Sequence, residues 1–114
     1  MERIFRSSVV LFFVLLLLTG LSFAQNVENG KKLFNDPSFG SSTNDKSCNS
    51  CHPNGKGLEQ SGKKEKIIIM GKELHSLEEA VNMCIEGPLS GKAIKIDSQE
   101  MKDIVAYIKS LTKN

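Results

Sequence analysis

The chain has 114 residues, a formal net charge of +2 at neutral pH, no tryptophan and an aromatic content of 6%. Its basic residues are spread along the chain and it lacks aromatic platforms for stacking bases, so we expect no nucleic-acid partner. A chain this short excludes a large hydrophobic core, and such domains often need a metal, a disulfide or a cofactor to complete the core.

The first 24 residues are typical of an export signal. Arg3 and Arg6 precede an unbroken apolar run over residues 9–18, and small residues stand at the two positions that a signal peptidase reads, Ser22 and Ala24. The run is shorter than the roughly 20 residues that a membrane-spanning helix needs. We therefore predict cleavage after Ala24 and a single domain over residues 25–114. The product should be soluble in the periplasm, without stable membrane insertion.

The first half of that domain is predicted to be mostly loop. Apolar periodicity predicts a short helix over residues 27–34, which Pro37 should stop. Gly, Ser, Thr and Asn dominate residues 38–46 and indicate a loop. The isoleucines at 67–69 fit either a strand or a buried extended segment, because so short a run has no decisive period.

The second half predicts two longer helices. Ser76 and Glu79 form a capping-box pattern before a helix from Leu77 to about Ile85. Asp97 is the expected cap of the last helix. One face of that helix is apolar, and it comprises Met101, Ile104, Val105, Ile108 and Leu111.

The most specific motif is Cys48-Asn49-Ser50-Cys51-His52. CxxCH is the attachment signature of haem c, in which two thiols bond to the porphyrin edge and the next residue reaches the iron. The motif therefore predicts one covalent haem c, held by Cys48 and Cys51, with His52 as an axial iron ligand.

Other uses of these residues remain open at this point. A thioredoxin-like redox pair would need a βαβ setting, which the pattern lacks, and a zinc site would need a second ligand pair where only His75 and Cys84 remain. A plain disulfide between the two motif cysteines would leave His52 without a role.

The chain resembles class I c-type cytochromes over nearly all of residues 25–114. The resemblance is carried by Gly30 and Phe34 in the first helix, the CNSCH motif after it, and Tyr107 in the last helix. It implies an all-α fold of three to four helices around one covalently attached haem. It also implies that the first and last helices cross at Gly30, with the two aromatic side chains packed there.

The second axial ligand is less clear from sequence. The candidates are His75, Met70, Met83, Cys84 and Met101. Class I cytochromes usually supply a methionine from the loop before the last helix, but residues 87–96 contain none.

The segment LEEAVNMCIEGPLSGKAIKIDSQEMKDIVAYIKSL is similar instead to thiosulfate dehydrogenases and related sulfur-oxidation cytochromes. Matching it position by position aligns Asn82, Cys84 and the Glu100-Met101 pair with that family. The resemblance implies that Cys84 is the second axial ligand. Among the other candidates, Met70 and Met101 are the alternatives. An inert thiol in the core is the other interpretation of Cys84.

These inferences predict a periplasmic electron-transfer protein that exchanges electrons with redox partner proteins. We favour a carrier over an enzyme. The alternative is a haem subunit or relative of a sulfur-compound oxidoreductase of the thiosulfate type. A haem-based ligand sensor would require an open or weakly held sixth position on the iron.

Overall fold

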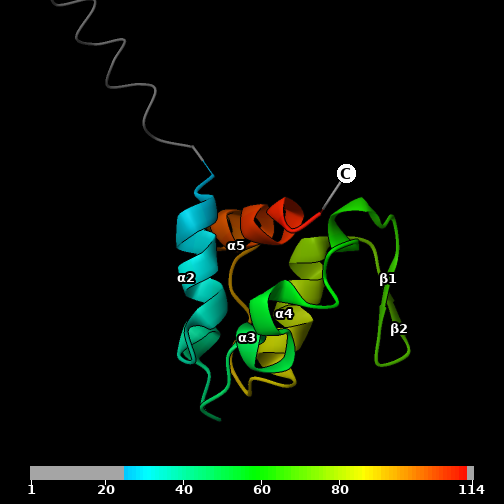
Figure 1. The fold of residues 1–114 in the computed structure, drawn as a ribbon. Coiled ribbons are helices and arrows are strands. Elements are labelled where there is room, and N and C mark those ends of the chain that lie inside the picture. Colours follow the sequence, from blue (N-terminus) through cyan, green and yellow to red (C-terminus); the bar gives the residue numbers. More distant parts are fainter. Residues whose placement is uncertain (1–24, 113–114) are drawn as a thin grey trace, which may run out of the picture.

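The computed structural model describes residues 25–112, so the predicted export signal over residues 1–24 lies outside the described part. Four α-helices occur there: α2 (Val27–Asn35), α3 (Cys48–Cys51), α4 (Leu77–Glu86) and α5 (Gln99–Ser110). Three short 3-10 turns and one β-hairpin lie between them (Figure 1). No helix in residues 25–112 has the length and apolar character needed to cross a bilayer.

The expectation of an all-α fold was incomplete. Strands β1 (Ile67–Ile69) and β2 (Lys72–Leu74) form an antiparallel pair in which Ile67 faces Leu74 and Ile69 faces Lys72. The run of isoleucines is thus a strand. The domain is a mainly helical fold with one small two-stranded sheet.

Helices α2 and α5 cross (Figure 1). They approach most closely at Gly30, as the resemblance to class I cytochromes implied. A β-carbon on Gly30 would collide with the Asp103 carbonyl oxygen, so only glycine permits this approach. The rings of Phe34 and Tyr107 meet edge to face beside it, with centroids 5.1 Å apart. Contact between the two backbones and this aromatic pair fixes the helices to each other.

Asp103 ties the start of α2 to α5. Its carboxylate accepts hydrogen bonds from the Asn26 amide at 2.9 Å, the Asn29 side chain at 2.7 Å and the Gln99 side chain at 2.8 Å. Only 2% of Asp103 is exposed. Burial raises the pKa of this carboxyl, but the three hydrogen bonds outweigh burial and leave the pKa below its usual value.

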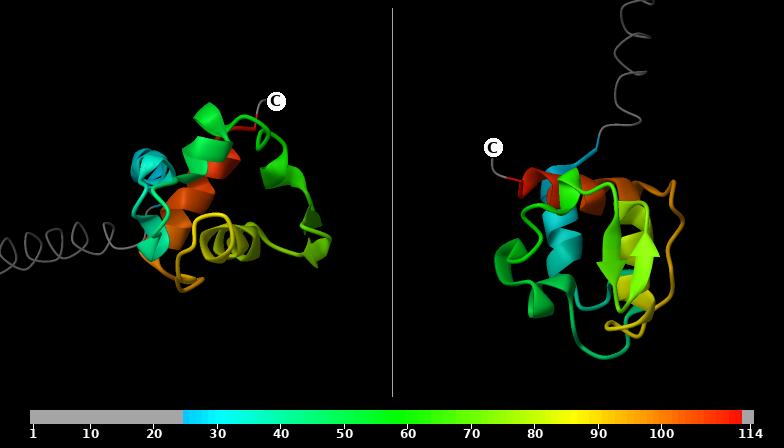
Figure 2. Two further views of the ribbon diagram at one scale, coloured as in Figure 1. Left: turned by 90° about the horizontal axis from the view of Figure 1, so that it is seen from below. Right: turned by 90° about the vertical axis from the view of Figure 1, so that its right-hand side faces the viewer.

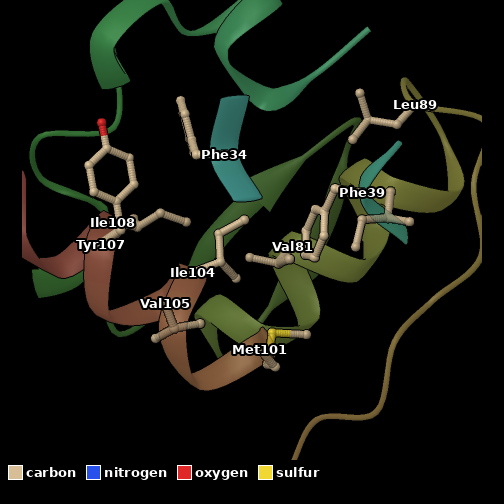
Figure 3. Packing of buried hydrophobic residues seen from close by; sticks show 10 residues of the cluster. Phe34, Phe39, Val81, Leu89, Met101, Ile104, Val105, Tyr107 and Ile108 are labelled. Carbon is tan, nitrogen blue, oxygen red and sulfur yellow. The ribbon is translucent and has the colours of Figure 1, made fainter. Parts of the chain in front are cut away.

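The apolar face predicted for the last helix forms the centre of the core (Figure 3). Met101 and Ile104 are almost completely buried, and Val105 and Ile108 lie beside them. The cap of α5 is Ser98, whose side chain accepts from the Met101 amide, rather than Asp97 as predicted. Either residue type can cap a helix, and the chain uses the one nearer the first helical turn.

Helix α4 begins as predicted, with the Ser76 hydroxyl accepting from the Glu79 amide at 3.1 Å. The Glu79 carboxylate accepts from the His75 amide, one residue earlier than a standard capping box requires. The hairpin packs beside α4 (Figure 2). This arrangement positions the site.

Candidate functional site

A cavity of about 400 Å³ lies between the CxxCH segment on one side and α4 with the hairpin on the other. Its walls are mostly apolar, which is typical of sites for cofactors and small molecules. Helix α3 and the turns after it supply Cys48, Cys51, His52, Gly57, Leu58, Ser61 and Lys64. The hairpin, α4 and the residues after α4 supply Ile67, Ile68, Ile69, Met70, Leu77, Ala80, Val81, Cys84, Pro88 and Leu89, and the helix crossing adds Phe34, Ile104 and Ile108.

The motif cysteines lie on the single turn of α3. The buried Ser47 before this turn donates its amide to the Ser50 hydroxyl at 3.0 Å, which fixes the start of the turn. Cys48 is half-buried and Cys51 is exposed, and neither forms a disulfide. Both side chains line the cavity, so two thiols are presented along one edge of it.

His52 follows the turn, and a hydrogen bond sets its tautomer. Its Nδ1 lies 3.0 Å from the backbone carbonyl oxygen of Lys56. Because a carbonyl only accepts, Nδ1 must carry the proton, and Nε2 keeps its lone pair for a metal. Metal-binding histidines commonly have this kind of outer partner. No sequence signal points to this contact, because the acceptor is a backbone atom.

Cys84 lies on α4, in the wall that faces the motif. Burial raises the pKa of its thiol, and the neighbouring Cys51 raises it further. Burial also raises the pKa of Cys48, to about 11, with a contribution from the nearby Cys84. The three thiols therefore share one cavity, and a bound cation would favour the thiolate of Cys84 because metals deprotonate coordinating thiols.

The other predicted ligand candidates lie in three different environments. Met70 lines the cavity at the tip of the hairpin. Met101 is 1% exposed in the core and Met83 is half-buried, and neither lines the cavity. His75 is exposed, as predicted, and faces the Glu73 carboxylate. Of the five candidates for the second ligand, only Cys84 and Met70 line the cavity together with the motif.

The loop after α4 is held firmly in place. Asn82 forms two hydrogen bonds of 2.9 Å with Ile94, donating its amide to the carbonyl and accepting from the backbone N–H. The Leu89 carbonyl accepts from the Ser42 hydroxyl at 2.5 Å, and the Lys92 amide donates to the Gly40 carbonyl at 2.7 Å. The loop that carries a methionine ligand in class I cytochromes is therefore a fixed wall here. Sequence matching pointed to Asn82 but not to this role.

The cavity residues fit a haem c on chemical grounds. Two thiols lie one helical turn apart on one wall, His52 has its Nδ1 occupied, and apolar side chains make up most of the remaining surface. No group of three or more His, Cys, Asp or Glu side chains in residues 25–112 is arranged to bind a bare metal ion. This donor set suits a metal that arrives within a large apolar ring better than a free zinc ion.

The family model described as SoxA/TsdA, cytochrome c domain, matches residues 29–114. The match includes every residue that lines the cavity, from Phe34 to Ile108, and covers the hairpin as well as the helices. No curated protein and no solved structure matches the chain.

Proposed function

The chain belongs to the SoxA/TsdA cytochrome c domain family and is a haem-binding electron-transfer cytochrome related to sulfur oxidation; from this premise we propose that it is an exported carrier with a single haem c. Family membership implies that haem c is bound covalently. The count of one is supported by the single CxxCH motif in the chain.

In this proposal each cavity residue has a defined part. Cys48 and Cys51 would form the thioether links, His52 would offer Nε2 to the iron, and Cys84 would offer a second ligand from α4. The haem provides a one-electron couple when bound. The protein holds the ligands, excludes water with apolar walls and sets the potential through the axial pair.

The observation that carries the proposal is that Cys84 lines the same cavity as the motif, on the opposite wall. Helix α4 can hold this thiol firmly, because Asn82 fastens the helix to the loop that follows it. Met101 is a weaker candidate for this ligand, because it is packed in the core and does not line the cavity.

The ferric spectrum of the purified haem-loaded protein tests the axial assignment. Thiolate and thioether bonds to ferric haem give different weak far-red bands, so Cys84→Ala should abolish the thiolate band. Met83→Leu is the matched control, because Met83 is a sulfur residue on the same helix outside the cavity, and it should leave the band unchanged. An unchanged spectrum in Cys84→Ala would show that Cys84 is not the ligand.

Export to the periplasm is the second part of the proposal. It is supported by the basic start, the short apolar run and the small residues before Gln25. Protein purified from a periplasmic fraction should begin at Gln25. A chain that keeps residues 1–24 would contradict cleavage.

Redox proteins are the proposed partners, and a sulfur-compound oxidoreductase remains the second candidate function. The family relation and the thiol ligand favour the latter, because a thiolate stabilises ferric iron and lowers the potential. Thiosulfate-dependent reduction of an electron acceptor by the purified protein separates the two. A carrier alone gives no turnover, and sustained turnover by this chain would establish an enzyme.

A further inference from the structure

Met70 occupies a position in the hairpin that does not suit a methionine. It is the first of two residues between β1 and β2, with φ +52°, and Gly71 follows with φ +76°. Two-residue hairpin turns of this kind favour Asn, Asp or Gly, because other side chains are strained at positive φ. Met70 is also 71% exposed, so core packing does not explain its presence. Such local conflicts are expected at functional positions.

The surroundings of Met70 place its sulfur near the wall that carries Cys84. Its side chain lines the cavity, and its terminal methyl lies 3.6 Å from where a β-carbon on Gly87 would be. Gly87 ends α4, three residues after Cys84, and residues three apart lie on neighbouring parts of a helix surface. The hairpin and α4 lie side by side (Figure 2). Two sulfur donors therefore share the wall opposite His52.

These two donors differ in what they prefer to bind. The Cys84 thiolate is anionic and favours ferric iron, whereas the Met70 thioether is neutral and soft and favours ferrous iron. We propose that Met70 replaces Cys84 as the axial ligand when the iron is reduced. This inference rests on the proposed axial role of Cys84.

Electrons and protons balance in this exchange. One electron from a donor protein reduces ferric to ferrous iron, and Cys84 leaves with the electron pair of its bond and takes a proton from water. A lone pair of the Met70 sulfur forms the new bond. Reoxidation by an acceptor protein reverses each change.

The fold indicates which element moves. Helix α4 is fastened through Asn82 and Ile94, and the residues after it are bonded to the Gly40–Ser42 segment. The hairpin consists of two three-residue strands, and a β-carbon added at Gly71, in its tip, would meet no heavy atom within 4 Å. The exchange would therefore require movement at the tip of the hairpin, which carries Met70, while α4 stays in place.

The test compares ferric and dithionite-reduced haem-loaded protein. Met70→Leu and Met70→Asn both remove the sulfur, but asparagine suits the positive φ and leucine does not, so a shared effect comes from the sulfur and not from the turn. Both variants should keep the wild-type ferric spectrum. In the reduced state they should lose the six-coordinate spectrum and bind carbon monoxide about tenfold faster or more, because no sulfur blocks the sixth position. Met83→Leu, the control, should match wild type in both states.

Two results would overturn the exchange. One is an unchanged reduced spectrum and carbon monoxide rate in both Met70 variants. The other is an altered ferric spectrum in both, which would make Met70 the ligand in either state. Failure of the Cys84 assignment is recognised separately, by an unchanged ferric spectrum in Cys84→Ala.

Discussion

Among the single residues of this protein, backbone atoms do much of the positioning. The Lys56 carbonyl leaves Nε2 of His52 as the nitrogen available to a metal, and the Asp103 carbonyl lies where any side chain on Gly30 would collide with it. Neither contact depends on the side chain of the residue that supplies the oxygen. Substitutions at His52 and Gly30 therefore test these arrangements more directly than substitutions at Lys56 or Asp103.

Gly30→Ala should destabilise the haem-loaded protein by about 1–3 kcal/mol, the usual cost of overpacking. The new β-carbon would overlap the Asp103 carbonyl oxygen, so α2 and α5 must separate. Denaturant unfolding measures the change. Lys31→Ala, an alanine at the exposed neighbouring position of α2, should change stability little. Equal stability of the two variants would contradict the close approach.

Asp103 should make stability depend on pH. The pKa of Asp103 is lower in the folded protein than in the unfolded chain, where it is about 3.9. The carboxylate therefore stabilises the fold above the unfolded pKa, and this stabilisation is lost as pH falls through the folded pKa. Asp103→Asn should cost about 1–3 kcal/mol at neutral pH, because one of the two acceptor oxygens becomes an NH2 donor that faces a buried donor. It should also flatten the decline in unfolding free energy below about pH 4. The exposed Asp97→Asn is the control and should retain the wild-type pH profile.

For the helices and strands, sequence periodicity was enough to predict α2, α4 and α5 to within about two residues. Their apolar faces and caps are local signals, and the CxxCH motif is equally local. Strand β2 was missed because Lys72–Leu74 contains only one buried apolar residue, which is too few to show a strand pattern. The turn before it was missed because position 70 is a methionine, whereas an asparagine there would have indicated a hairpin turn.

Long-range polar contacts could not be read from the sequence at all. The bond pair between Asn82 and Ile94 joins residues twelve apart, and the bonds from Asn26 and Asn29 to Asp103 join residues more than seventy apart. No periodicity or motif encodes such pairings. The sequence pointed to the CxxCH motif and to Cys84 as candidates, but which residues line one cavity with the motif depended on the tertiary structure.

Asn82→Ala tests the fastening of α4 to its loop. Losing both bonds should leave the Ile94 amide and carbonyl without their partners and destabilise the protein by about 1–3 kcal/mol. Hydrogen exchange at the Ile94 amide should accelerate, which local unfolding of the loop would produce. Asn35→Ala, which removes an exposed bond to the Lys31 carbonyl, is the control. Unchanged exchange at Ile94 would show that the loop is held by its other contacts.

Across the molecule as a whole, the cavity draws on every main element of the fold. Helices α2, α3, α4 and α5 and strand β1 all contribute lining residues, and most of that surface is apolar. Such walls are stabilised when they are covered, so a large apolar cofactor would complete the core of this small domain. Binding of the cofactor and stability of the fold should therefore depend on the same cavity residues.

Every function proposed for this protein depends on one haem being linked covalently to Cys48 and Cys51. Intact mass under denaturing conditions measures that link, using protein made in a host that matures c-type cytochromes. Wild type should have the polypeptide mass plus one haem, and the Cys48→Ser, Cys51→Ser double variant should have the bare polypeptide mass. A wild-type protein with the bare mass, or one that releases its pigment on denaturation, would rule out the covalent link.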